Sequence, residues 1–267
     1  MSFFFINIYP MKHLKTFEQL ITESKRFKDV DSITLDWCKD NITEKEFFSY
    51  IENLSINEGW FEGAKQWLVN AGEATVNWFK EKFFKILMTM LKSAVEVGMS
   101  IINKVVQFVS WIFDKLNKFA DKHPTVWKII LVTLIMFIFL VVCASSAKAQ
   151  TTGQPIDPNV INSSIGMLKA NMHTSGMDKT ELYMKAMAYL VDIRDGHQDI
   201  SSELIGERAI DMAKHSLDVI SSYKKSGDSV GADFMSYAAS SIREGANYVG
   251  AEITKMGGTE SVKLFIK

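Results

Sequence analysis

The sequence predicts an all-α, single-pass membrane protein with a long amphipathic helix before the membrane span and a small helical bundle after it. Three observations lead to this fold class. Residues 129–147 contain no charged side chain, residues 60–123 repeat apolar side chains every three or four positions, and residues 159–267 hold further helical patterns without the alternation of a strand. A chain of 267 residues is long enough for two modest domains, one on each side of such a span.

The beginning of the chain is also predicted to be helical. Residues 11–23 place their apolar side chains on one face, as a short amphipathic helix does. Residues 24–59 are expected to form a small helical region that precedes the long amphipathic segment.

Residues 11–25 read MKHLKTFEQLITESK. This segment resembles the short leader of internal virion proteins in tailed phages of the T-even type, which steers such proteins into the prohead. The resemblance implies cleavage between Glu23 and Ser24, because the head protease of these phages cuts after Ile/Leu-x-Glu. It also implies that Met11 is the true start and that residues 1–10 are mis-assigned, because the leaders of this family begin at the start codon.

Residues 60–123 are predicted to form one long amphipathic helix, or two helices broken near Gly98. Its apolar stripe is expected to face a membrane or a partner, and it consists of Phe83, Leu87, Leu91, Val95, Ile102, Val105, Phe108, Val109 and Ile112. Three arrangements fit this pattern. The stripe packs on another helix, lies in the membrane surface, or lines a pore in an oligomer. Simple insertion as a second span is excluded, because Lys92, Glu96 and Lys104 would each cost a few kcal/mol at bilayer depth.

Residues 124–149 are predicted to be the transmembrane helix. At 1.5 Å per residue the uncharged run of 129–147 covers about 28 Å, close to the hydrocarbon thickness of a bilayer. The span is represented by Ile129, Leu134, Phe137, Leu140 and Val142, and the interfacial anchor by Trp127 and Lys128. The alternative is a helix buried in the core of a soluble protein.

The charges on the two flanks of the span differ. Lys115, Lys118, Lys122 and Lys128 precede it, whereas only Lys148 follows closely. Because positively charged flanks stay in the cytoplasm, the N-terminus is expected inside and the C-terminal domain outside.

The end of the span also resembles a processing site. Small residues at 147 and 149 flank Lys148, which is the A-x-A pattern that follows the apolar part of a signal sequence. Cleavage between Ala149 and Gln150 would release the C-terminal half outside the cytoplasm. The alternative is a membrane helix that ends in small residues.

The C-terminal part is predicted to be a linker followed by a helical bundle. Residues 150–158 are polar and rich in helix breakers, and residues 159–267 form the bundle. We expect Asp178 to cap one of its helices and Asp199 or Ser201 to cap the next. The last long helix carries a row of small residues, which allows another helix to approach it closely.

No catalytic, cofactor or metal site is predicted. The chain lacks the GxSxG, GxxxxGK[ST], GxGxxG and CxxC motifs. The acidic stretch from Asp192 to Asp199 is better explained as a solvated helix end than as a metal site. Cys38 and Cys143 are expected in different environments, so no disulfide is implied. A net charge of −1 argues against a nucleic-acid partner.

Two functions fit these features. The first is a non-enzymatic phage-type membrane protein that is packaged in the virion and associates with or permeabilises the host membrane. The second is an inner-membrane scaffold or binding module whose C-terminal bundle recruits an unknown protein. Both predict the lipid bilayer as a partner, and both predict self-association.

Overall fold

The apolar run lies in α7 (Pro124–Thr152), which has Pro124 at its first position and ends at Gly153. Gly153 adopts the left-handed conformation with a φ of 67°, and glycine takes up this conformation without steric cost. The helix therefore continues three residues past the expected boundary at 149. The expected linker is reduced to the turn between α7 and the next helix.

The computed structural model describes residues 29–57, 77–121, 123–196, 200–223 and 229–256. The expected mis-assigned start (1–10), the leader-like helix (11–23) and the tail after 256 lie outside these residues. Within them the chain is helical and has no strand, which confirms the all-α prediction. Besides α7, the helices are α2 (Val30–Cys38), α3 (Glu44–Asn57), the π-helical η1 (Phe79–Phe83), α5 (Phe84–Val97), α6 (Ser100–Ala120), α8 (Pro158–Thr174), α9 (Glu181–Asp195), α10 (Ser202–Ser222) and α11 (Ser229–Lys255).

The long amphipathic segment contains a helix pair. Gly98 separates α5 from α6 with a φ of 79°, so the predicted break near Gly98 is present. Residues 60–76 of the predicted segment lie outside the described residues. Ser201 caps α10 through a hydrogen bond to the N–H of Leu204, as expected. The predicted cap at Asp178 is wrong, because Thr180 caps α9 instead and Asp178 pairs with His173 at 2.8 Å.

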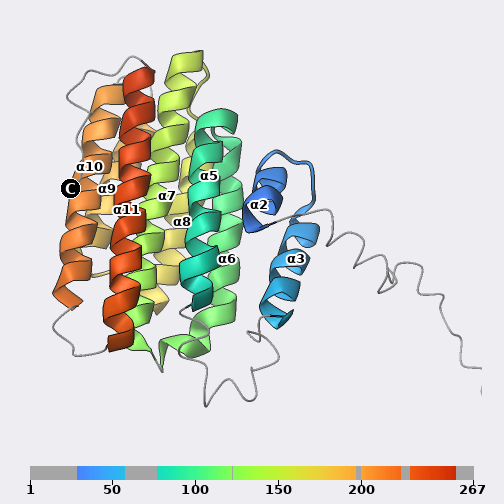
Figure 1. Ribbon diagram of the computed structural model, residues 1–267. Helices are drawn as coiled ribbons and strands as arrows, with labels where there is room; N and C mark the ends of the chain where they lie inside the picture. The colour runs from blue at the N-terminus through green and yellow to red at the C-terminus, as the bar shows by residue number, and fades with distance from the viewer. Residues whose placement is uncertain (1–28, 58–76, 122, 197–199, 224–228, 257–267) are drawn as a thin grey trace, which may run out of the picture.

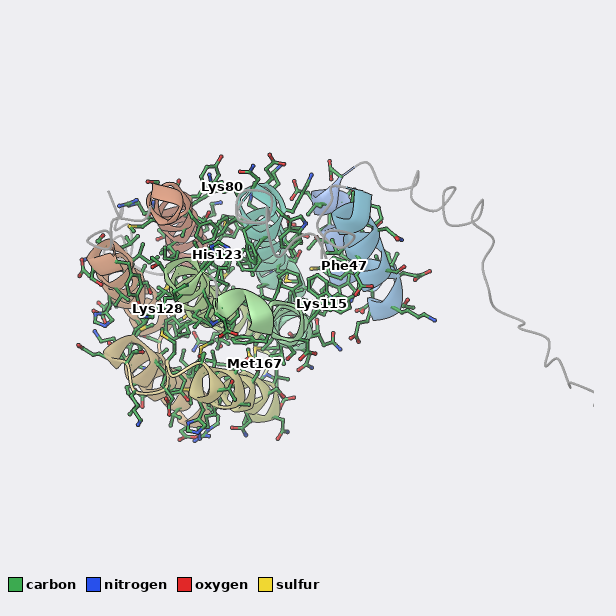
Figure 2. All side chains as sticks on the ribbon, turned by 90° about the horizontal axis from the view of Figure 1, so that it is seen from below. Phe47, Lys80, Lys115, His123, Lys128 and Met167 are labelled. Atoms are coloured by element: carbon green, nitrogen blue, oxygen red, sulfur yellow. The ribbon has the colours of Figure 1, made fainter. Side chains whose placement is uncertain are left out.

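α7 lies in the middle of a helical bundle (Figure 1). The helices α5, α6, α8, α9, α10 and α11 all pack on it. Every residue in its most apolar stretch of 18 residues is buried by the surrounding protein. The view along the bundle in Figure 2 shows the other helices closing around α7, with side chains filling the space between them.

This arrangement differs from the expected division into two separate halves. Helices that precede and follow α7 pack on each other as well as on α7, as α6 does with α8 and α5 with α11. Each half has an apolar face to bury, and α7 has no polar face. Without lipid, packing both halves around α7 buries all three apolar surfaces at once.

Candidate functional site

The most unusual feature of the described structure is α7 itself, a helix long and apolar enough to cross a membrane. The most apolar stretch of 18 residues in α7 has a mean hydropathy of 2.9, and the predicted span residues are all fully buried inside the bundle. Those residues are Ile129, Leu134, Phe137, Leu140 and Val142. A helix enclosed on all sides needs an apolar surface all round, so burial and membrane insertion call for the same composition.

The row of small residues on α11 consists of Ala238, Ala239, Ser240, Ser241, Gly245, Ala246, Gly250 and Ala251, and Gly245 among them packs directly on α7. Gly245 of α11 lies so close to α7 and α5 that a Cβ atom there would be 3.1 Å from Leu140 Cδ1 and 3.2 Å from Leu91 Cδ2. The predicted close approach of another helix is therefore confirmed, and the other helix belongs to the same chain. Small residues at this contact let α11 cover α7 more tightly than a larger side chain would allow.

The C-terminal end of α7 is joined to neighbouring turns by hydrogen bonds. Ser145 Oγ donates to the carbonyl of Gly98 at 3.2 Å, which joins α7 to the α5–α6 turn. Gln150 donates to the carbonyl of Ile200 and accepts a hydrogen bond from Ser202 Oγ at 2.6 Å. The C-terminal end of α7 is thus held by both halves of the chain.

The predicted interfacial anchors lie at the opposite end of α7, shown from below in Figure 2. Trp127 is buried and packs edge-on against Phe113, with ring centroids 5.4 Å apart. Lys128 is exposed, and its ammonium group lies 6.0 Å from the ring centroid of Tyr223. In this state Trp127 therefore packs in the bundle and only Lys128 reaches solvent.

The apolar stripe of α5 and α6 is buried along its whole length. Each of its residues is at most 9% exposed: Phe83, Leu87, Leu91, Val95, Ile102, Val105, Phe108, Val109 and Ile112. Part of it packs on α7, and part is covered by the α2–α3 hairpin, which lies at the outer edge of the bundle (Figure 1). Of the three predicted arrangements, the structure therefore has the one in which the stripe packs on other helices.

The α2–α3 hairpin contacts α5 and α6 through an aromatic cluster. Phe47 stacks on Trp37 with ring centroids 4.1 Å apart, and it meets Phe108 of α6 edge-on with ring centroids 6.4 Å apart. Phe48 stacks on Trp111 of α6 at 5.4 Å. Such contacts stabilise the hairpin where it lies on α6.

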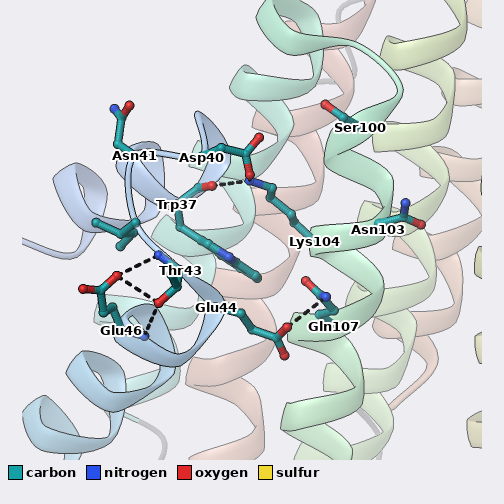
Figure 3. Close-up of a pocket in the computed structure, with 11 residues that line it drawn as sticks. Trp37, Asp40, Asn41, Thr43, Glu44, Glu46, Ser100, Asn103, Lys104 and Gln107 are labelled. Atoms are coloured by element: carbon teal, nitrogen blue, oxygen red, sulfur yellow. Dashed lines mark hydrogen bonds and ion pairs between the residues drawn. The ribbon is translucent and has the colours of Figure 1, made fainter. Parts of the chain in front are cut away.

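Lys104 is the buried charged group at this contact, and its role could not be predicted from the sequence. Its ammonium group donates to the carbonyls of Trp37 and Cys38 and to the carboxylate of Asp40 (Figure 3). These oxygens lie at the C-terminal end of α2, where a cation is favoured by the unpaired carbonyls. Asp40 follows α2 with a φ of 59°, which turns its side chain towards Lys104.

A polar cavity of about 530 Å³ opens beside Lys104. It lies between the α2–α3 turn and the first half of α6 (Figure 3). On one side Gln107 donates to Glu44 at 3.0 Å, and on the other Thr43 donates to Glu46 at 2.8 Å from its backbone N–H. These side chains are already hydrogen-bonded to one another, and the cavity marks the boundary between the α2–α3 hairpin and α6.

A second polar network joins α9 to α10. Tyr189 donates to Asp211 at 2.7 Å, Lys185 pairs with the same carboxylate at 3.0 Å, and Arg208 pairs with Asp192 at 3.0 Å. Burial alone would raise the pKa of Asp211, but the hydrogen bonds from Tyr189 and Lys185 outweigh it and lower this pKa below its usual 3.8.

The proposed processing positions differ in accessibility. Glu23 and Ser24 lie outside the described residues, so cleavage between them stays a prediction. Ala149 is 1% exposed and, like Gln150, lies within α7. A protease needs an accessible, extended segment, so the closed bundle does not present the bond between Ala149 and Gln150.

Among the described residues, no three side chains of His, Cys, Asp or Glu are arranged to hold a metal ion. Asp192, which belongs to the acidic stretch before Asp199, is paired with Arg208.

Cys38 and Cys143 are both buried free thiols. Burial raises the pKa of Cys38 to about 11, so this thiol is unreactive while α2 stays in place.

Comparison of the chain with protein-family models, with curated proteins and with solved structures found no match.

Proposed function

We propose that this protein is a non-enzymatic, membrane-active protein that carries a membrane-spanning helix inside a closed helical bundle and transfers it to a lipid bilayer. The observation that carries the proposal is α7. It is 29 residues long, its most apolar stretch of 18 residues has a mean hydropathy of 2.9, and its uncharged run is flanked by Lys128 and Lys148. α11 is nearly as long with 27 residues, so length alone does not set α7 apart, but among the described helices only α7 is also apolar enough to cross a membrane.

The energetics favour transfer to lipid over exposure to water. Each fully buried Leu, Ile or Phe contributes about 1.5–3 kcal/mol relative to water, so uncovering α7 in water costs on the order of tens of kcal/mol. Lipid tails are as apolar as leucine, and each Leu, Ile, Val or Phe at the centre of a span contributes about −0.3 to −0.6 kcal/mol to insertion. A bilayer can therefore replace the helices that cover α7.

In the inserted state that we propose, the N-terminus is cytoplasmic and the C-terminal domain is extracytoplasmic. This orientation follows from the lysines before α7. The helices α8–α11 must then cross the bilayer as separate helices, because a folded bundle cannot pass.

Packaging in a phage particle rests on the leader of residues 11–23 alone. Mass spectrometry of purified particles tests it, and a packaged copy with an intact N-terminus would contradict it.

The decisive experiment uses the full chain in detergent-free buffer. Alone, it is expected to remain in the supernatant after ultracentrifugation. With vesicles of phosphatidylethanolamine and phosphatidylglycerol, it is expected to float with the lipid, to resist extraction by alkaline carbonate, and to yield a protected fragment containing residues 124–152 when protease is added outside.

Two other results would contradict the proposal. If the chain never floats with vesicles, α7 is only a core helix of the bundle. If the chain floats but carbonate extracts it, the protein binds the membrane surface without inserting α7. Membrane-free binding of another protein through α8–α11 would support the second function named above, a scaffold or binding module.

A further inference from the structure

The α2–α3 hairpin and the α5–α6 hairpin on which it lies carry opposite charges. Residues 29–57 hold seven acidic and two basic side chains, a net charge of −5. Residues 77–121 hold seven basic and four acidic side chains, a net charge of +3. The chain as a whole has a net charge of −1, so this separation is local to the two segments. Part of it lies at their contact, where Lys39 of the first segment also pairs with Glu96 of the second at 3.0 Å.

The contact has a polar rim around its aromatic centre. Acidic groups of the α2–α3 hairpin meet α5 and α6 at Asp31 with Thr89 at 3.0 Å, Asp40 with Lys104 at 2.5 Å, Glu44 with Gln107 at 3.0 Å, and Glu52 with Lys115 at 2.9 Å. Most of these partners are partly exposed, and such pairs contribute about 0.2–1 kcal/mol each. The polar rim therefore consists of weak contacts that surround the buried aromatic centre and can be lost together.

The surface that the hairpin covers has the composition of a helix that binds a membrane surface. Phe108 and Trp111 lie at its centre, Lys104 is buried beside them, and Lys115 lies at the rim. Helices with aromatic residues on one face and lysines beside it bind at the headgroup level, and each lysine near an anionic surface contributes about 1 kcal/mol. The acidic hairpin occupies this surface in the closed bundle, and an anionic bilayer would repel it.

We propose that the α5–α6 surface beneath the α2–α3 hairpin binds anionic lipid headgroups, and that the acidic α2–α3 hairpin occupies this surface until the protein reaches a bilayer. The inference rests on the proposed function, because it assigns the first membrane contact of the same bundle. It adds a binding surface, the class of lipid that it takes, and the segment of the chain that must leave.

The test releases the hairpin without changing the lysines. Asp40→Asn with Glu52→Gln removes two carboxylates that contact α6. The matched control, Asp29→Asn with Asp36→Asn, makes the same change in net charge on the same hairpin. Asp29 caps α2 and Asp36 accepts from Asn41, and an Asn side-chain oxygen can serve in both places. All chains carry Cys143→Ala, so that Cys38 is the one thiol that can react.

Cys38 reports release of the hairpin, because it is fully buried in α2, which packs on α5. We expect maleimide to react with Cys38 about tenfold faster in Asp40→Asn/Glu52→Gln than in the control. We also expect the released variant to bind vesicles rich in phosphatidylglycerol about tenfold more tightly than the control. Neither variant should bind phosphatidylcholine vesicles, and added salt should weaken the binding.

Two results would overturn the inference. One is an equal reaction rate of Cys38 in the variant and the control, and the other is a faster rate without tighter binding to anionic vesicles. Either result leaves the proposed function standing if the wild-type chain still yields the protected α7 fragment. If no protected fragment forms with any vesicle, the proposed function fails, whatever surface binding the variants show.

Discussion

Gly245 sets how closely α11 can approach α7. Any side chain at this position would press on Leu140, Leu91 and Phe137, whose nearest atoms lie 3.1–3.4 Å from the place of a Cβ. These three side chains are fully buried and have little room to move. The residue is a glycine inside a long helix, where glycine costs about 0.5–1 kcal/mol relative to alanine, so the close contact offsets that cost.

Gly245→Leu is expected to lower the free energy of unfolding by about 1–3 kcal/mol, because the added carbons overpack the contact between α11 and α7. Gly166→Leu is the matched control, since Gly166 lies inside α8 with nothing within 4 Å of its Cβ position. The control should leave stability unchanged or raise it by up to about 1 kcal/mol. Urea denaturation followed by circular dichroism measures both, and equal effects would show that the contact at Gly245 is loose.

Lys104 illustrates what the sequence could not predict at this scale. In sequence it is a charge within an apolar helical pattern, and there it excludes simple insertion of the segment. Its actual partners, the carbonyls of Trp37 and Cys38, lie more than 60 positions earlier in the chain. Only the packing of α2 on α5 and α6 brings these atoms together, and no local pattern encodes that packing.

At the scale of elements, α9 and α10 are joined by charged groups as well as by apolar contacts. Tyr189 and Lys185 of α9 both bind Asp211 of α10, and Arg208 of α10 binds Asp192 of α9. His215 lies on the same helix and lowers the pKa of Asp211 slightly further. The two helices are therefore expected to separate more easily in acid than helices joined by apolar contacts alone.

The pKa of Asp211 is lowered in the folded chain, so its ionised form stabilises the fold. This stabilisation is present above the ordinary pKa of 3.8 and is lost as the pH falls through the lower pKa of the folded state. Asp211→Asn should therefore cost about 0.5–1 kcal/mol at pH 7, a modest value because the carboxylate is 46% exposed. The difference from wild type should shrink below about pH 4.

Urea unfolding at pH 7, 5, 4 and 3 measures this effect. Asp218→Asn, an exposed carboxylate on the same helix, serves as the control and should change little at any pH. A constant difference between wild type and Asp211→Asn over the whole range would show that the hydrogen bonds, and not the charge, stabilise the α9–α10 contact.

The elements themselves were largely predictable, whereas their surroundings were not. The sequence predicted a helix over 124–149, and it gave a break near Gly98 and a cap at Ser201 each as one of two alternatives; the structure has all three. A fully apolar helix has the same composition in lipid and inside a ring of helices, so the sequence of α7 could not tell which environment surrounds it. The contact of α6 with α8 shows that both halves share one core.

At the scale of the whole molecule, the closed bundle and the proposed inserted state differ in contacts between helices and not in the helices themselves. The backbone hydrogen bonds of each helix are internal, so they survive transfer into lipid. What the bundle loses is the packing of α5, α6 and α8–α11 on α7, and the bilayer supplies an apolar surface in its place.

This difference leads to a spectroscopic prediction for the full chain. On addition of phosphatidylglycerol vesicles, the far-ultraviolet circular dichroism at 222 nm should change by no more than about a tenth, because the helices persist. The near-ultraviolet signal should largely disappear, because buried rings such as Trp37, Trp78 and Trp127 leave their packed surroundings. The same chain with phosphatidylcholine vesicles is the control and should keep both signals. Retention of the near-ultraviolet signal in chains that float with anionic vesicles would mean that the bundle binds lipid while closed, with α7 still covered by its own protein.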